Sequence, residues 1–309
     1  MLVRVLRSPP VWISLIVVVA ASTLPLAVSG YILGLLTIAY YFGVFSMAWD
    51  LLFGFANEVN FGPTFLIGLG AYTAGILDNQ YQPPIWLCVL AGACAAVAGG
   101  VVLALPALRL RGPYFGLTTL VAVLMLQNFI VVAASLTGGE IGLTVPDVIS
   151  IDDKVNYWIA LAFMTVSGAI LYALSRSPVG LILQASGQDA VQAAALGFNV
   201  TKHKLVAFIV SALFSGLAGA LMVFYLGAAS VTAFIDLTVG VQVIIGAVLG
   251  GRRTILGAVI GAVFLVAMGE ALRPFGDLAT FIVSAMALVV VLLFPSGFLG
   301  MLTREREAA

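Results

Sequence analysis

The chain has 309 residues, of which 62% are apolar and only 8% are charged, and its mean hydropathy is +1.19. A soluble domain carries about 25% charged residues, because water must wet its surface. The composition therefore excludes an ordinary soluble globule and predicts a membrane protein whose outer surface meets lipid. The net charge is zero, which argues against a nucleic-acid partner because such a partner needs a basic face.

Apolar runs long enough to cross a bilayer recur along the whole chain. A span needs about 20 apolar residues, and this criterion predicts an all-α bundle of about ten spans. The first run follows Arg4 and Arg7 and resembles a signal peptide, but it is long and a second span follows at once, so we expect it to remain uncleaved. The predicted spans are 11–29, 31–53, 61–77, 85–107, 114–135, 156–174, 204–227, 238–250, 254–272 and 278–295.

The basic residues predict the orientation, because Lys and Arg concentrate on the cytoplasmic side of a membrane protein. With the N-terminus inside, Lys154 and Arg273 are the only two of the 13 basic residues that fall outside. An even number of spans then places both termini in the cytoplasm. We expect a single transmembrane domain over residues 1–309.

The cytoplasmic segment 176–203 is predicted to contain two short helices. Pro178 ends the sixth span, Gly187-Gln188-Asp189 separates the two helices, and Gly197 ends an alanine-rich run. Alanine favours helices and glycine commonly ends them. Such helices present small, closely approachable surfaces that suit docking to a partner protein. The alternative is a long, partly ordered loop.

Polar residues within spans are candidates for a translocation path, because they are costly in lipid and usually face a cavity or another helix. The segment 57–62, followed by Pro63, looks like a broken helix, and glycines are expected to interrupt the eighth span in the same way. Paired interruptions are typical of transport sites built from irregular backbone, whereas glycine alone also suits close helix packing. The candidates are Asp50, Asn57, Asn60, Gly62, Gln127, Asn128, Gln242 and Glu270. Asp50 and Glu270 lie near span ends, where interfacial water is the alternative partner.

Six segments in order resemble the permeases of branched-chain amino acid ABC importers, specifically the LivM-like subunit. They are residues 50–75 (DLLFGFANEVNFGPTFLIGLGAYTAG), 105–120 (LPALRLRGPYFGLTTL), 135–143 (SLTGGEIGL), 178–221, 248–251 (VLGG) and 294–300 (FPSGFLG). The resemblance covers nearly the whole chain. It implies an assembly with a homologous LivH-like permease, two cytoplasmic ATP-binding subunits and a periplasmic substrate-binding protein. It also implies that the loop 176–203 docks on an ATPase, through Gly180, Gln184, Asp189, Ala193, Ala195, Gly197 and Lys202.

The sequence contains no GxxxxGK[ST] motif for cradling ATP phosphates. With one histidine and two cysteines that lack metal-ligand spacing, it also predicts no catalytic site, no metal and no cofactor. We therefore expect a transport subunit for branched-chain or related hydrophobic amino acids, which uses ATP hydrolysed by its partners. The alternatives are an ABC permease for urea, short amides or aromatic compounds, a stand-alone secondary transporter or channel, and an assembly subunit without a path of its own.

Overall fold

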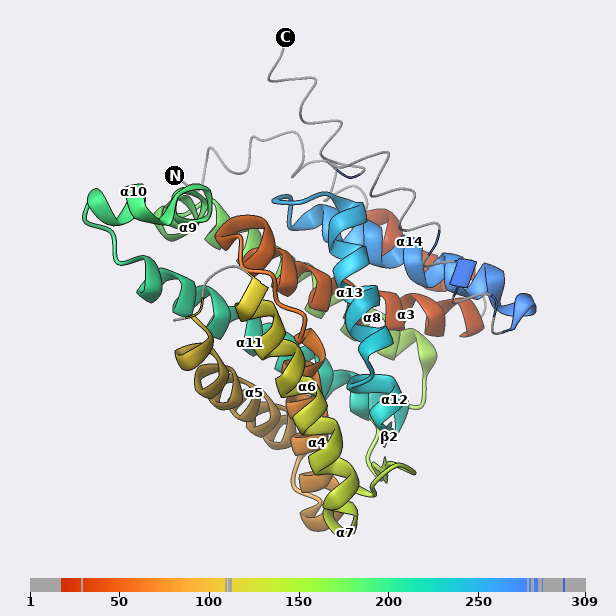
Figure 1. The fold of residues 1–309 in the computed structure, drawn as a ribbon. Coiled ribbons are helices and arrows are strands. Elements are labelled where there is room, and N and C mark those ends of the chain that lie inside the picture. Colours follow the sequence, from red (N-terminus) through yellow and green to blue (C-terminus); the bar gives the residue numbers. More distant parts are fainter. Residues whose placement is uncertain are drawn as a thin grey trace.

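The computed structural model describes residues 18–28, 30–108, 110, 113–276, 278, 281–282, 285 and 297. Apart from one pair of two-residue strands, this part of the chain is a bundle of helices (Figure 1). The long helices are α3 (Gly30–Asp50), α4 (Pro63–Tyr81), α5 (Ile85–Ala107), α6 (Pro113–Val132), α8 (Asp153–Ser175), α11 (Val200–Leu226), α13 (Leu237–Gly250) and α14 (Leu256–Leu272). The shorter elements are η1 (Leu24–Leu26), η2 (Leu51–Phe55), α7 (Ala134–Thr137), β1 (Leu143–Thr144), α9 (Pro178–Gln188), α10 (Ala190–Ala195), β2 (Ala228–Ala229), α12 (Val231–Phe234) and η3 (Arg273–Phe275).

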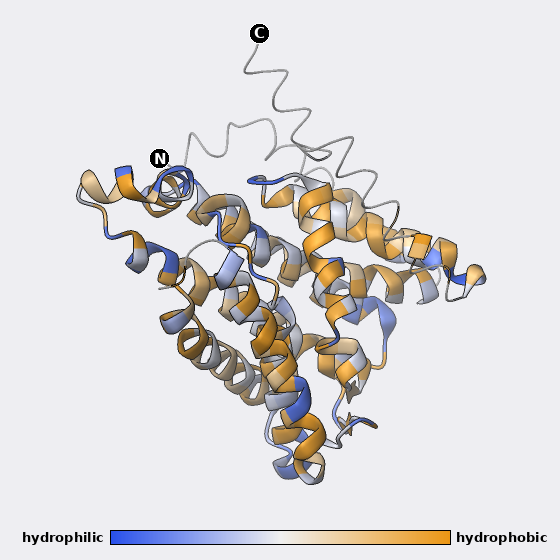
Figure 2. Ribbon diagram, in the orientation of Figure 1, coloured by the Kyte–Doolittle hydropathy of each residue, from blue (hydrophilic) through white to orange (hydrophobic). Residues whose placement is uncertain are grey.

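Seven helical segments in the described part are long and apolar enough to cross a membrane. They coincide with the predicted second, fourth, fifth, sixth, seventh, eighth and ninth spans, and this confirms a multi-pass helical protein. The predicted third span forms the continuous helix α4, which is not among the seven. Residues 11–17 and 29 of the first predicted span and most of the tenth span lie outside the described residues. Figure 2 shows hydrophobic residues along the helices and hydrophilic residues towards helix ends and connections.

Local capping signals explain where several helices begin. Each of these helices follows a residue whose side chain accepts a backbone N–H group of the first turn. These residues are Asp152 before α8, Ser177 before α9, Asp189 before α10, Asn199 before α11 and Asp236 before α13. Short polar side chains are favoured there because the first N–H groups of a helix have no partner within it. The two predicted short helices of segment 176–203 are therefore present as α9 and α10.

Helix α11 lies at the centre of the bundle, packed against α3, α4 and α5. Its small residues permit a close approach to α4, since a Cβ on Gly70 would lie only 2.7 Å from the Cα of Gly216. Small residues are used in this way at helix interfaces in membranes, where lipid provides no hydrophobic drive between helices. Around this centre, α14 packs on α3 and α13, and α8 packs on α3.

The eighth predicted span differs from expectation. Its glycines do not interrupt the helix, because α13 runs without a break from Leu237 to Gly250. They serve close packing instead: a Cβ on Gly250 would lie 2.7 Å from the backbone nitrogen of Ala258 in α14. The expectation of a second broken helix is therefore wrong, and the packing alternative for these glycines is correct.

The strands join two distant connections at the end of the bundle opposite α9 and α10 (Figure 1). They are antiparallel, and Leu143 pairs with Ala229 and Thr144 with Ala228. Val145 extends the contact by donating its N–H to the carbonyl of Gly227 at 2.9 Å. The segment between α7 and α8 is thereby tied to the connection between α11 and α12.

Candidate functional site

The interruption between α3 and α4 is the irregular centre of the candidate site. After α3 the chain makes one π-helical turn, η2, and then leaves the helix with Asn57 at φ 56°. Single π turns within helices are rare and occur often at functional sites. The buried Asn60 stabilises the return: its carbonyl accepts the indole N–H of Trp49 at 2.6 Å, and its side chain accepts the N–H of Gly62 at 2.8 Å.

Gly62 places this interruption directly against α6. A Cβ at residue 62 would lie 2.9 Å from the carbonyl carbon of Thr119, so no larger residue fits without displacement. The hydroxyl of Thr119 also accepts the N–H of Phe61 at 3.0 Å. The predicted broken helix is therefore present, and its backbone is held by α3 and α6.

Asp50, at the end of α3, is only 1% exposed, and its carboxylate holds the connection between α13 and α14. One oxygen accepts the N–H of Arg253 at 3.1 Å and the other accepts that of Ile255 at 3.0 Å. Arg253 and Ile255 both have positive φ, 66° and 53°. A buried charge is tolerated only with such partners, so the geometry gives Asp50 a structural role.

Three cations secure the same interruption from other elements. Arg252 lies over the ring of Phe53, 4.3 Å from its centroid, and donates to the side chain of Asn57. Arg253 donates from Nε to the carbonyl of Gly54 at 2.7 Å. Lys204, near the start of α11, forms a largely buried ion pair with Glu58. Burial, together with neighbouring Arg253, lowers the pKa of Arg252 from its ordinary value, and Asp50 opposes this effect.

The predicted docking residues occupy different environments in segment 176–203. Gly180 and Ala193 are buried, and Gln184 and Asp189 are half-buried. Asp189 caps α10 by accepting the N–H groups of Val191 and Gln192 at 2.8 and 3.0 Å. Ala195, Gly197 and Lys202 are exposed. Gly197 has φ 89°, and a Cβ there would meet no atom within 4 Å.

Four large apolar side chains on α9, on α10 and just after α10 are exposed, which the sequence analysis did not single out. We call this set the apolar α9–α10 surface; its members are Leu181, Val191, Leu196 and Phe198, exposed by 57%, 76%, 76% and 39%. The last turn of α9 rests on the interruption after α3, because a Cβ on Gly187 would lie 2.6 Å from the carbonyl oxygen of Phe55. One segment thus combines an exposed apolar surface with a direct backbone contact to η2.

The remaining path candidates do not gather with Asp50, Asn57, Asn60 and Gly62. Gln127 on α6 is half-buried and donates to the carbonyl of Ile235 at 3.1 Å, whereas Asn128 is exposed and bonds within its own helix. Gln242 on α13 is half-buried, with no hydrogen-bond partner assigned among the described residues. Both helices pack on α4.

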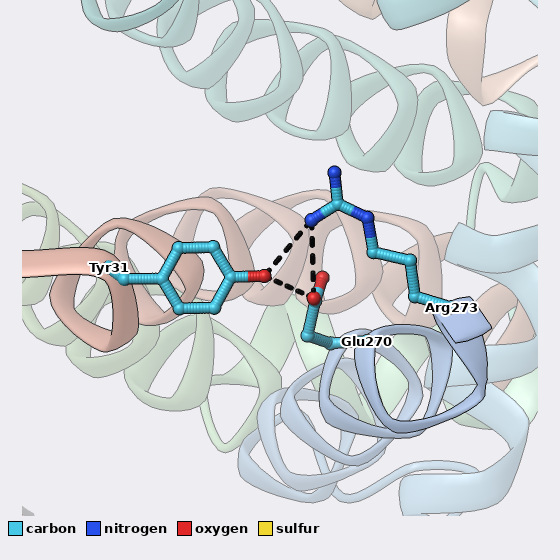
Figure 3. Close-up of polar contacts among 3 residues, drawn as sticks. All are labelled: Tyr31, Glu270 and Arg273. Carbon is cyan, nitrogen blue, oxygen red and sulfur yellow. Dashed lines mark hydrogen bonds and ion pairs between the residues drawn. The ribbon is translucent and has the colours of Figure 1, made fainter.

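Glu270 lies in a separate cluster at the end of α14 (Figure 3). It accepts the hydroxyl of Tyr31 and pairs with Arg273 at 3.3 Å, and Arg273 also donates to the Tyr31 hydroxyl at 3.0 Å. The Arg273 side chain is 70% exposed, and such exposed pairs contribute little to stability. The cluster joins the start of α3 to the end of α14. The eight predicted path residues therefore do not form one cluster: four lie at the interruption after α3, two on α6, one on α13 and Glu270 at the end of α14.

No group of three potential metal-ligating side chains occurs in the part of the chain that the structure describes. The structure contains a bundle of apolar helices, an interrupted helix in contact with α6, α9, α11 and the α13–α14 connection, and a short helical pair with exposed apolar side chains. These features define a multi-pass membrane protein, because seven helical segments of the described part are long and apolar enough to cross a bilayer.

Comparison with known proteins gives the family. The family model described as "Branched-chain amino acid transport system / permease component" matches residues 31–294, and the chain belongs to this family. It is 26% identical to the high-affinity branched-chain amino acid transport system permease protein LivM of Escherichia coli K12, over 92% of this chain and 73% of that protein. LivM of Salmonella typhimurium gives the same identity and coverage. The corresponding LivH protein of Escherichia coli K12 is 23% identical, over 85% of this chain and 92% of LivH. No solved structure matches the chain.

Proposed function

We propose that this chain is the permease subunit of an ABC importer that carries branched-chain or related hydrophobic amino acids across the bacterial inner membrane. Its partners are a homologous LivH-like permease, two cytoplasmic ATP-binding subunits and a periplasmic substrate-binding protein. The observation that carries the proposal is the α9–α10 segment, which exposes an apolar surface and rests directly on the interrupted helix after α3. The family membership and the absence of a phosphate-cradling motif in the sequence support it.

Energy transfer in this proposal begins at the apolar α9–α10 surface, to which an ATP-binding subunit docks. A displacement of α9 reaches η2 through the contact between Gly187 and Phe55. From there it reaches the α13–α14 connection through Asp50, Arg252 and Arg253. The predicted arrangement of ten spans with both termini in the cytoplasm places all these contacts on the cytoplasmic side.

The substrate path in this proposal runs along α6 and α13, over α4, and the partner permease completes it. Polar side chains on these helices support this placement, because Asn128 is exposed and Gln242 only half-buried within apolar segments. Lipid offers such side chains no hydrogen bonds, so a protein or water-filled surface is the environment that satisfies them. Asp50, Asn57, Asn60 and Gly62 instead shape the moving element at the end of the path.

A stand-alone secondary transporter is less well supported. It would need an ion-coupling carboxylate free to change partners inside a span. Asp50 is the buried acid at the interrupted helix, and both of its oxygens are engaged with backbone N–H groups. An ABC permease for urea, short amides or aromatic compounds would have the same subunits and transfer energy in the same way, but it would transport a different substrate. The test below distinguishes these substrates.

The test is reconstitution of the chain with its partner subunits and binding protein, followed by measurement of leucine-stimulated ATP hydrolysis. Gly197→Arg places a large cation beside the apolar α9–α10 surface and is expected to abolish stimulation. Gly227→Arg is the matched control, since Gly227 also follows a helix with positive φ and open space but lies at the opposite end of the bundle. Each change costs about 1–2 kcal/mol in backbone strain.

Loss of stimulation in Gly197→Arg, with assembly intact and Gly227→Arg active, supports the proposal. If urea or an amide stimulates ATP hydrolysis and leucine does not, the substrate differs from the one proposed and the energy transfer stands. ATP hydrolysis that responds to no substrate, or transport that needs no ATPase, overturns the proposal.

A further inference from the structure

A buried acid with an unused oxygen lies at the end of the bundle opposite α9 and α10. Asp78, in the last turn of α4, is fully buried. One of its carboxylate oxygens accepts the backbone N–H of Asp147 at 3.1 Å. The other oxygen is buried and has no hydrogen-bond partner among the described residues. A buried polar atom without a partner costs about 1–3 kcal/mol, so this oxygen calls for an explanation.

The group facing Asp78 is a second carboxyl group. The side chain of Asp147 is half-buried and lies beside that of Asp78, because the backbone N–H of the same residue bonds to the Asp78 carboxylate. The other titratable group nearby is the thiol of Cys88 on α5, which is fully buried and lies within the electrostatic influence of both acids. The described ion pairs, Lys204 with Glu58 and Arg273 with Glu270, involve neither acid. Two acids therefore lie together, one of them fully buried, and neither is paired with a cation among the described residues.

Two adjacent carboxylates cannot both be ionised at such a place without a large electrostatic cost, and one bound proton removes that cost. The proton also provides the missing hydrogen bond. We propose that Asp78 and Asp147 share one proton, which lies between the free oxygen of Asp78 and the carboxylate of Asp147, and that this pair holds the segment 143–152 against the end of α4.

The shared proton links pH to the mobility of that segment. While the proton is bound, Asp78 holds both the N–H and the side chain of Asp147. As the pH rises and the proton leaves, two like charges repel across a short distance and the segment loosens. The effect extends beyond the loop, because β1 within this segment pairs with β2, and β2 leads through α12 into α13. This inference does not depend on the transported substrate.

The test uses the full chain in lipid nanodiscs and infrared difference spectra recorded during a pH titration. The wild type is expected to show the carbonyl band of a protonated carboxylic acid at about pH 6, where an ordinary aspartate is ionised. The intensity of the band is expected to fall in Asp78→Asn and in Asp147→Asn. Glu140→Gln is the matched control, because Glu140 is an exposed acid of the same segment, and it should retain the band.

Hydrogen exchange of the amides in 143–149 is the second measurement. Asn at position 147 can donate an N–H to Asp78 at any pH, so Asp147→Asn should keep the segment protected across the titration. The wild type should lose protection relative to Asp147→Asn, compared at the same pH, as the acid band disappears. A wild type without the band, a band of unchanged intensity in both Asn variants, or equal protection of the two proteins at every pH would overturn the proposal.

Discussion

The carboxylate of Asp50 allows the sharpest test of how the interruption after α3 is held. Asp50→Ala removes the acceptor for the N–H groups of Arg253 and Ile255, which stand at positive φ just before α14. A hydrogen bond to a charged group contributes about 1.5–3 kcal/mol, so losing two is expected to lower the free energy of unfolding by about 3–6 kcal/mol. Asp50→Asn keeps one acceptor and should lose about half of that.

Asp236→Ala is the matched control, because Asp236 accepts a single N–H, that of Thr238, at an exposed helix start. Loss of such a cap costs about 1 kcal/mol. The assay is the midpoint of thermal unfolding of the purified chain in nanodiscs, with hydrogen exchange of residues 251–255 as a local readout. If Asp50→Ala unfolds at the same temperature as Asp236→Ala, or leaves exchange in 251–255 unchanged, the structural role assigned to Asp50 is refuted.

Three further changes test other contacts. Gly70→Val should force α4 away from Gly216 in α11 and lower the thermal midpoint sharply. Its control is Gly269→Ala: a Cβ there meets nothing within 4 Å, so this change should raise stability by about 0.5–1 kcal/mol. In the reconstituted importer, Gly187→Val should reduce transport more than ATP hydrolysis, because α9 can no longer contact the backbone of Phe55. Its control is Ala185→Val, at an exposed position of the same helix, which should leave both rates unchanged. In a chain without native cysteines, substrate should protect a single cysteine at position 242 from a thiol reagent. A single cysteine at the buried position 60 should react slowly with or without substrate. Labelling at position 242 at the same rate with and without substrate would contradict the proposed path.

The sequence by itself determined the class of protein and most of its helices. Apolar runs of sufficient length predict spans because the bilayer imposes a thickness, and seven of them recur as candidate spans among the described residues. Pro178, the break at Gly187-Gln188-Asp189 and Gly197 predict α9 and α10, because helix termination depends on residues within one turn. The broken segment 57–62 was predicted for the same local reason.

Only the tertiary structure decided what these elements do to one another. Asp50 reads in the sequence as a polar residue near a span end, and its partners lie 203 and 205 positions away along the chain. Glycines look alike in sequence, so those of α13 suggested a broken helix until packing against α14 showed them to be contacts. The unused oxygen of Asp78 likewise follows from burial. Local sequence patterns determine whether a segment is stable in lipid or as a helix. The partner of a buried charge or of a small residue lies far away in the sequence, so it depends on how the whole chain folds.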